Sequence, residues 1–518
     1  MSSAISYRKN YFKIYIWQAL SILLGFASLF VVVPYLSSDK TLYGIYSVCT
    51  SLTIFFSYAD LGFIPAGVKY AAEYFVQGDR KNEMRVIGFT AFVMVSAFLV
   101  VALAILVLAL FPNLLIPDIV VGAESYKIAQ ALLLILAVSC PVIIGQRILS
   151  IVFTTRVEDY LFQRMMIVGN IARILSVLYF FRDGQYRVVE YYLFYQAVNL
   201  LVVIAGMLYT KKYGYKFADF LRTIRFDKEI FDKVKRISGT SLIMTICMIL
   251  YYELDQIAIS HWVGIEAVAI YGAALSVMTF VRTFSSLVFS PYTSRYNHFV
   301  GLNNMDGLSA FVNKMIRMFG VILVVPIATV SIFAKPFVIS WIGPEYTESA
   351  LLLTLMAFGF ATNFIKEPIC SYFVATERNQ ILLKSNCLLP LIYWLGIAVT
   401  IKFLGLESFA IFKFLAPTIV AIYYWKIAAN DFKERRQQFV TLRESLSPVI
   451  WSLIVIGILG YIALPHMFYS HQKTSLLLNI LIMGICLCAT MVVGVLTNKT
   501  LKQEILAVIN PIISKLRK

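Results

Sequence analysis

Charged residues are scarce in this 518-residue chain: only 14% are Asp, Glu, Lys or Arg, whereas 60% are hydrophobic. A soluble protein has about a quarter of its residues charged. The chain therefore cannot cover a large water-exposed surface, which excludes an ordinary soluble domain. The four histidines are scattered, and the seven cysteines lie in or beside apolar runs without metal-ligand spacing. We expect neither a metal site nor disulfides.

Nucleotide-binding and catalytic motifs are also absent. The sequence has no GxxxxGK[ST] loop, and its longest hydrophilic break, residues 211–236, is too short to be a nucleotide-binding domain. No long loop carries paired acids or a His–Asp set. We therefore expect a protein that is not an enzyme, that needs no cofactor and that does not hydrolyse ATP by itself.

What the sequence does have is a succession of membrane-length apolar runs. With about 20 apolar residues per span, we count about fourteen transmembrane helices. They begin near Tyr15, Leu42, Val86, Ala129, Tyr160, Val188, Ile237, Val268, Met315, Ala350, Ile381, Ser408, Val449 and Ser475. No small-residue cleavage motif follows the first run, so we expect it to remain as a span. The predicted fold class is an all-α, polytopic membrane protein.

The basic residues are distributed unevenly between the two sides of these spans. The net charge is +17, and roughly three quarters of the lysines and arginines fall on the side of the N-terminus, which by the positive-inside rule faces the cytoplasm. We therefore expect a multi-pass membrane protein with both termini in the cytoplasm. The charge is explained by topology and by acidic lipids, without nucleic acid.

A basic break divides the first twelve spans into six and six. We predict an N-terminal lobe at residues 1–210, a cytoplasmic amphipathic linker at 211–236, a C-terminal lobe at 237–430, and two further spans with a basic tail at 431–518. A weak repeat supports two related lobes, because residues 65–70 and 291–296 both read Pro-x-x-x-[Lys/Arg]-Tyr. Repeated halves with a substrate between them are a common transporter plan.

Charged residues at span depth are functional candidates, because a charge in hydrocarbon is costly and is rarely placed there without a role. Arg173 and Arg282 are nearest the middle of their spans, where guanidinium groups can meet an anionic substrate bidentately. The alternative is a structural ion pair with a carboxylate such as Asp60 or Glu253. The predicted substrate-binding residues are Asp60, Arg147, Arg173, Arg282 and Lys413.

Three carboxylates are candidates for binding a coupling proton or sodium ion: Glu253, Asp255 and Glu367. A buried carboxylate has a raised pKa that suits proton exchange. On one continuous helix, Glu253 and Asp255 are expected to point ~200° apart and cannot both face one cavity. Glu367 adjoins Lys366, so a local ion pair is the alternative there.

Several short motifs, in order along the chain, resemble a known family. They are YGIY at residues 43–46, ADLG at 59–62, YAAE at 70–73, GD at 78–79, LDQIAIS at 254–260, AIYGAA at 269–274, and AKPF with WIGPEY at 334–346. They resemble the polysaccharide transporters, the Wzx-type O-antigen and capsule repeat-unit flippases of the multidrug/oligosaccharidyl-lipid/polysaccharide exporter superfamily. The last third of the chain adds little to this resemblance.

The resemblance implies a MATE-like fold with two six-helix lobes, plus two C-terminal helices, around a cavity that opens alternately to either side. It implies a polyprenyl-diphosphate-linked oligosaccharide as substrate, an ion gradient as the driving force, and a polysaccharide polymerase and a chain-length regulator as partners. It also implies that the membrane is a bacterial cytoplasmic (inner) membrane. Three alternatives stay open: a lipid II-type precursor flippase, a cation-coupled small-molecule exporter and, from a different class, a membrane glycosyltransferase or polymerase.

Overall fold

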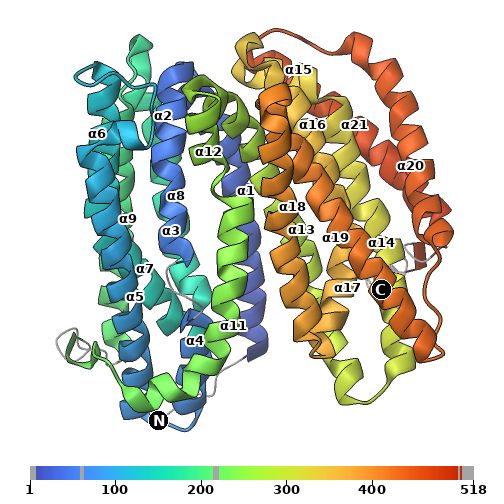
Figure 1. Cartoon of the computed structure of the whole chain (residues 1–518), viewed down its shortest axis with the longest axis horizontal. Coiled ribbons are helices and arrows are strands. Elements are labelled where there is room, and N and C mark those ends of the chain that lie inside the picture. The colour runs from blue at the N-terminus through green and yellow to red at the C-terminus, as the bar shows by residue number, and fades with distance from the viewer. Residues whose placement is uncertain (1–6, 59–62, 214–220, 500–501, 504–518) are drawn as a thin grey trace, which may run out of the picture. The chain divides into compact units, whose positions relative to one another are not determined.

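The computed structural model describes residues 7–58, 63–213, 221–499 and 502–503, and in these residues the protein is built from helices without strands (Figure 1). The chain forms two compact units, residues 1–272 and 273–518. One continuous helix, α13 (Ile265–Gly301), runs from the first unit into the second. The predicted all-α, polytopic fold class is thus confirmed.

Unit 1 pairs its long helices side by side: α5 packs against α4 and α6, and α8 packs against α1 and α9. Its helices before α13 are α1 (Tyr7–Leu36), α2 (Lys40–Ser51), α3 (Thr53–Tyr58), α4 (Phe63–Val76), α5 (Arg80–Leu110), η1 (Pro112–Leu114), α6 (Glu124–Val138), α7 (Cys140–Thr155), α8 (Asp159–Phe180), η2 (Arg182–Gly184), α9 (Val188–Thr210), η3 (Lys211–Tyr213), α11 (Lys228–Tyr252) and α12 (Asp255–Trp262).

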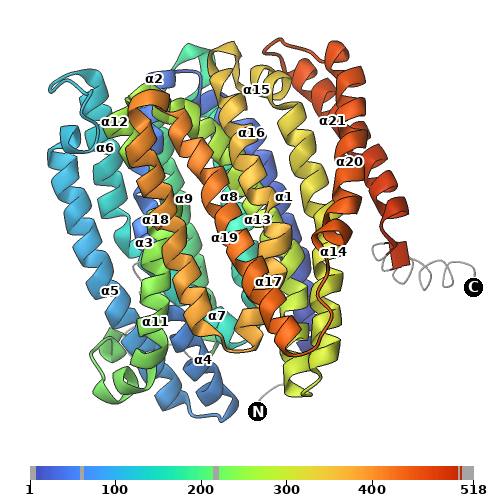
Figure 2. The same cartoon turned by 45° about the vertical axis from the view of Figure 1, so that its right-hand side comes forward.

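Unit 2 is organised around α14, which packs against α16, α17, α20 and α21, while α18 packs against α19 (Figure 2). Its helices after α13 are α14 (Met305–Ile332), α15 (Ala334–Ile342), η4 (Pro344–Tyr346), α16 (Glu348–Ala361), α17 (Asn363–Ala375), α18 (Asn379–Leu404), α19 (Glu407–Glu434), α20 (Leu442–Ala463), η5 (Leu464–His466) and α21 (Lys473–Thr497).

By length and hydropathy, 11 helices of the described residues are candidate membrane spans, or up to 13 if each bent pair is one span. These thirteen correspond to thirteen of the fourteen predicted spans. The exception is the predicted span that begins near Leu42. There the chain forms two shorter helices, α2 and α3, separated at Leu52, and Asp60 lies just beyond them, outside the described residues.

Two candidate spans are bent where one helix ends and another begins. The bend is 41° between α6 and α7 and 42° between α11 and α12. Pro141 lies at the first turn of α7, where a missing N–H is harmless. Pro326, Pro390 and Pro417 remain inside α14, α18 and α19. Within membranes such positions are tolerated because neighbouring groups satisfy the freed carbonyls.

The boundary between the compact units lies within α13, further along the chain than the predicted linker at residues 211–236. The linker's last part is the beginning of α11, which packs against α4 and α5 of unit 1. The division of the chain into lobes of six spans stays a prediction.

Five helices end in the same kind of C-terminal cap. Each has a residue of positive φ just after the helix, namely Gly78, Val157, Asn303, Glu377 and Arg436. The next N–H then bonds to the carbonyl five residues back, as from Asp79 to Tyr74 and from Glu158 to Phe153, the pattern of a Schellman motif. In all five caps the accepting residue is Tyr or Phe.

These caps follow the second, fourth, eighth, tenth and twelfth predicted spans, which all end on the predicted cytoplasmic side. Two pairs of caps therefore lie at matching positions of the first and second sets of six spans: those after the second and eighth spans, and those after the fourth and tenth. Four of the five positive-φ residues are not glycine, so the repetition is one of backbone geometry more than of residue type. This agrees with the internal repeat that residues 65–70 and 291–296 indicate.

Close helix contacts in unit 2 require glycine at Gly359 of α16. A Cβ placed there lies 2.3 Å from the carbonyl oxygen of Lys413 on α19, whereas a Cβ at Gly457 of α20 meets nothing within 4 Å. Small residues at such contacts let two backbones approach, which is how helices pack in membranes.

We predict that Gly359→Ala destabilises the detergent-solubilised protein by about 1–3 kcal/mol, because a backbone cannot yield as a flexible side chain does. The control is Gly457→Ala, which makes the same change of helix propensity in open space. The apparent Tm, measured by size-exclusion chromatography after heating, should fall for Gly359→Ala only. Equal Tm values for the two variants would contradict the close contact.

Candidate functional site

Arg173, one of the predicted substrate-binding residues, lies half-buried on α8. Its guanidinium carbon is 4.4 Å from the centre of the Tyr195 ring on α9. Tyr195 is stacked with Tyr192 at 5.8 Å, and Tyr192 meets Tyr46 of α2 edge-on at 6.0 Å. We call Arg173, Tyr46, Tyr192 and Tyr195 the Arg173–tyrosine cluster. It combines one cation on α8 with three rings, one from α2 and two from α9.

Among the described residues, no carboxylate forms an ion pair with Arg173. A guanidinium stacked on a ring keeps its in-plane N–H groups available as donors, and these fit phosphate oxygens bidentately. The tyrosine rings present flat apolar faces with a polar hydroxyl at one end. The cluster is therefore suited to a ligand that carries both phosphate and sugar.

Polar residues extend this site along α8 and α9. Gln163, Asn170 and Arg173 are spaced by seven and three residues, which places them on one face of α8. On α9, the side-chain amide of Asn199 donates to that of Gln196, which is buried. Sequence reasoning identified only Arg173 of this set. The available signal was the tyrosine-rich stretch at residues 191–195, inside an otherwise apolar span.

Glu253 and Asp255 lie at the break between α11 and α12. Glu253 is the C-cap of α11, and Asp255 begins α12. The expected angle of ~200° between them assumed one continuous helix. That assumption is wrong, because α11 ends before Glu253 and α12 begins at Asp255. Asp255 is buried, 1% exposed, and accepts a hydrogen bond from the Tyr271 hydroxyl. In transporters, broken helices coordinate coupling ions through unwound backbone carbonyls and helix C-terminal ends, so the binding of an ion near Glu253 and Asp255 stays a prediction.

The four remaining predicted residues that the structure describes are divided between unit 1 and unit 2. Arg147 is half-buried on α7 in unit 1, and Arg282 is half-buried on the part of α13 that belongs to unit 2. Lys413 of α19 is only 5% exposed, and its Nζ lies 4.8 Å from the centre of the Tyr393 ring. Glu367 forms the predicted local ion pair with Lys366, at 3.8 Å. The roles of all these residues remain predictions.

Sequence reasoning missed a buried ion pair at one end of unit 1. Glu83 of α5 is 1% exposed and Arg156, the C-cap of α7, is 5% exposed; Nη2 of Arg156 donates to Oε1 of Glu83 at 2.7 Å. Arg80 also contacts Glu83, at 3.1 Å. The Arg156 guanidinium lies over the ring of Phe75. Both charges lie beside loops in the sequence, so hydropathy alone assigned them to the water-exposed side.

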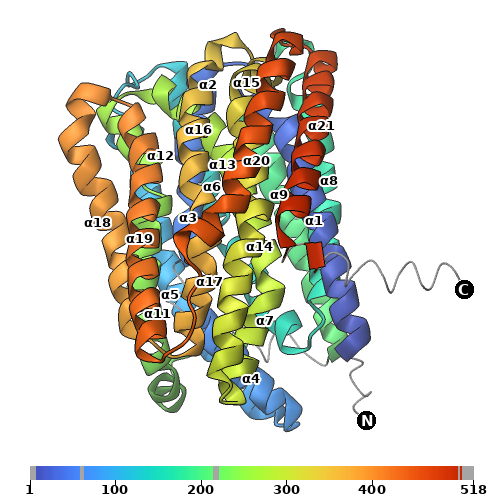
Figure 3. The same ribbon diagram turned by 90° about the vertical axis from the view of Figure 1, so that its right-hand side faces the viewer.

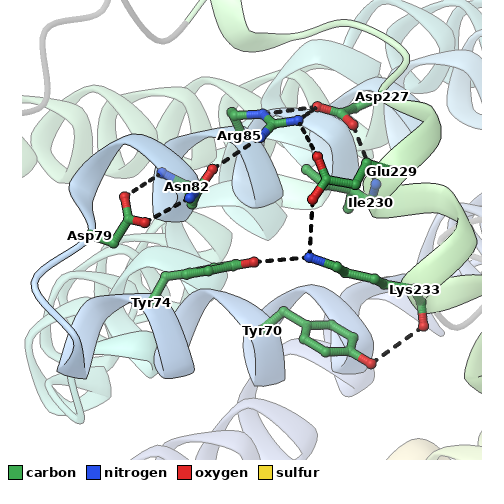
Figure 4. A network of polar contacts seen from close by, with 9 residues as sticks. All are labelled: Tyr70, Tyr74, Asp79, Asn82, Arg85, Asp227, Glu229, Ile230 and Lys233. Atoms are coloured by element: carbon green, nitrogen blue, oxygen red, sulfur yellow. Dashed lines mark hydrogen bonds and ion pairs between the residues drawn. The ribbon is translucent and has the colours of Figure 1, made fainter.

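A second polar network attaches α11 to α4 and α5 (Figure 4). Arg85 donates to Asp227 from Nε and Nη2, at 3.0 and 2.6 Å, and from Nη2 to Glu229 at 3.2 Å. Lys233 donates to Glu229 and to the Tyr74 hydroxyl, both at 3.2 Å. We call Tyr74, Arg85, Asp227, Glu229 and Lys233 the α11 clamp. Asp227 also caps α11 by accepting from the N–H of Ile230.

The charges of the α11 clamp shift one another's pKa. Burial acts to raise the pKa of Asp227, but hydrogen bonds from Arg85 and Ile230 outweigh it and hold that pKa below its ordinary value. Hydrogen bonds from Lys233 and Arg85 lower the pKa of Glu229. Hydrogen bonds to Tyr74 and Glu229 raise the pKa of Lys233. All three groups are thus held in their charged forms.

We predict that the α11 clamp stabilises the packing of α11 against α4 and α5 equally throughout the neutral pH range. Its carboxylates contribute fully above their ordinary pKa, about 4, and their contribution is lost only as the pH falls through the lowered values. Lys233 contributes until the pH rises through its raised pKa. Arg85→Ala should increase the rate of backbone amide hydrogen exchange in residues 228–233 at neutral pH. The control is Lys212→Ala, which removes an exposed cation and should leave that rate unchanged. Unchanged protection in Arg85→Ala would contradict the clamp.

Comparison with known proteins supports a transporter fold. Residues 241–394 match the MatE family model. A relative in Bacillus subtilis (strain 168), the uncharacterized membrane protein EpsK, is 23% identical over 225 residues. That match covers 43% of this chain and 43% of the relative, so it spans less than half of the relative's length.

Two solved structures resemble most of the chain. The lipid II flippase MurJ, in an inward closed conformation, has a TM-score of 0.65 at 12% identity and covers 93% of this chain and 97% of its own. An inward-facing multidrug resistance MATE family transporter of the MOP superfamily has a TM-score of 0.58 at 15% identity and covers 80% and 95%. The protein is therefore an all-helical, multi-pass membrane protein with the fold that MurJ and MATE transporters share, and it carries a MatE segment.

Proposed function

We propose that the protein is a flippase that moves a polyprenyl-diphosphate-linked oligosaccharide, the repeat unit of an O-antigen, capsule or other surface polysaccharide, from the inner to the outer leaflet of the cytoplasmic membrane. The observation that carries this proposal is the Arg173–tyrosine cluster, a cation and three tyrosine rings at span depth in a transporter fold. A diphosphate and its sugars cannot cross hydrocarbon without a polar route. The cluster supplies a phosphate donor and sugar-sized aromatic faces in one place.

The extent of the structural likeness favours a lipid-linked substrate. The lipid II flippase covers 93% of this chain and the multidrug transporter 80%. The candidate spans of this chain include a last pair, α20 and α21. These two additional spans are what the resemblance to polysaccharide transporters implies, since the drug exporters of the superfamily usually lack them.

Alternating access would use the bent spans and the buried charges. Arg147, Arg282 and Lys413 are further cations at span depth for the diphosphate. Glu253 and Asp255, at the break in the seventh predicted span, and Glu367 are the candidates for a coupling proton or sodium ion. In this proposal the termini are cytoplasmic, and the lipid-linked product in the outer leaflet passes to a polysaccharide polymerase and a chain-length regulator.

The proposal predicts that Arg173→Ala reduces surface polysaccharide at least about tenfold, because a charged hydrogen-bond donor to the diphosphate is lost. Arg173→Lys should retain part of the export, since lysine keeps the charge without the bidentate geometry. The measurement is surface glycan, together with lipid-linked precursor by mass spectrometry, in a deletion strain complemented with each variant. Arg443→Ala, which removes an exposed arginine at the start of the thirteenth predicted span, is the control.

The measurement needs one control of protein level, and two outcomes would contradict the proposal. Arg173→Ala must be present in the membrane at the wild-type level, and the precursor must accumulate while the glycan is lost. Wild-type export by both Arg173→Ala and Arg282→Ala would reject the assignment of the site. Undiminished glycan in the deletion strain itself would reject the function.

A lipid II-type precursor flippase is the second candidate, and the similarity to MurJ favours it. Here the substrate carries the same diphosphate on a cell-wall sugar unit. Depletion of the protein distinguishes the two. Growth arrest with lysis indicates the cell-wall precursor, whereas viable cells without surface polysaccharide indicate the repeat-unit substrate.

A further inference from the structure

Two cation–ring contacts join α1 and α8 near their N-terminal ends. Nζ of Lys13 on α1 lies 4.7 Å from the centre of the Tyr160 ring on α8. The guanidinium carbon of Arg164 on α8 lies 5.9 Å from the Trp17 ring of α1. On each helix the two residues are four apart and share one face, and α1 packs against α8 (Figure 3). We call these four residues the α1–α8 seam.

The α1–α8 seam lies where the two spans enter the membrane. The first candidate span begins at Ile16, and α8 begins at Asp159, so all four residues are within about two turns of an entry point. Trp and Tyr are the residues that occupy the interface between hydrocarbon and water. Lysine and arginine at that level extend their charges toward the head groups.

Neither cation of the α1–α8 seam has a carboxylate partner among the described residues. The acids that precede Tyr160 on the chain already have other partners: Glu158 accepts from the Tyr213 hydroxyl, and Asp159 accepts from Thr154. The nearby guanidinium of Arg156 is paired with Glu83. An aromatic face attracts a cation but does not neutralise it. Arg164 is exposed, and Lys13 is half-buried.

We propose that the α1–α8 seam binds the phosphate group of an acidic phospholipid in the leaflet that faces the N-terminus. The two cations donate to the phosphate oxygens, with the guanidinium matching two of them in its plane. Trp17 and Tyr160 orient the cations and lie against the start of the acyl chains. The site is separate from the Arg173–tyrosine cluster: Arg164 and Arg173 are nine residues apart on α8, which places them on opposite faces of the helix. Its occupancy does not depend on which substrate is transported.

The test uses the full-length protein in nanodiscs of phosphatidylcholine with increasing phosphatidylglycerol, and bound lipid is counted by native mass spectrometry. The double variant Lys13→Ala/Arg164→Ala should bind phosphatidylglycerol about ten- to thirtyfold more weakly than the wild type. The control is Lys69→Ala/Lys212→Ala, which removes two exposed cations that also lie near tyrosine rings, at 5.3 and 5.4 Å. This control should bind as the wild type does.

A second variant separates binding from folding. Lys13→Arg/Arg164→Lys keeps both charges and should retain most of the affinity, even if the alanine variant is poorly folded. Equal binding of phosphatidylglycerol by the wild type and a folded alanine variant would overturn the proposal, as would equal weakening in the control. A polyprenyl diphosphate that displaces phosphatidylglycerol from the wild type at equimolar amounts would show that the occupant is the lipid carrier and would overturn the phospholipid assignment.

Discussion

Placing a positive charge among apolar helices is the constraint that recurs most often in this protein. A cation that leaves water loses its hydration and must gain other partners. Here the partner is repeatedly an aromatic ring: Tyr195 for Arg173, Tyr393 for Lys413, and Phe75 for Arg156. A ring compensates part of the lost hydration without cancelling the charge.

A cation that lies beside a ring differs from a cation that is paired with a carboxylate, as Arg173 and Arg156 show. Arg156 lies over a ring but also donates to the buried Glu83, so its charge is already matched, and the pair joins α5 to the end of α7. Removing one member of such a buried pair costs about 3–5 kcal/mol, because the other charge is left uncompensated. Arg173 has no such partner among the described residues. Arg156 is thus matched by a carboxylate, whereas the ligand-binding role of Arg173 stays a prediction.

Hydropathy predicted most of the fold because a helix must satisfy its backbone hydrogen bonds internally in hydrocarbon. Thirteen predicted spans therefore correspond to helices or bent helix pairs. One expectation of local geometry was wrong. The helix around Glu253 and Asp255 is broken, so the angle expected between these carboxylates does not apply. Residues 228–236 of the predicted linker form the start of α11, which Asp227 caps, and Arg85, 142 residues earlier in the chain, binds that cap.

The sequence by itself determined the membrane class, the number and order of most spans, and the residues whose charge is expensive at span depth. All of these follow from the free energy of transfer of each side chain, which is local information. Only the tertiary structure decided which charges are paired and which rings lie beside them. It brought Tyr46, Tyr192 and Tyr195 from two other helices to Arg173, and it buried Glu83 against Arg156. Such contacts depend on the packing of helices far apart in the chain, and no short segment of sequence encodes them.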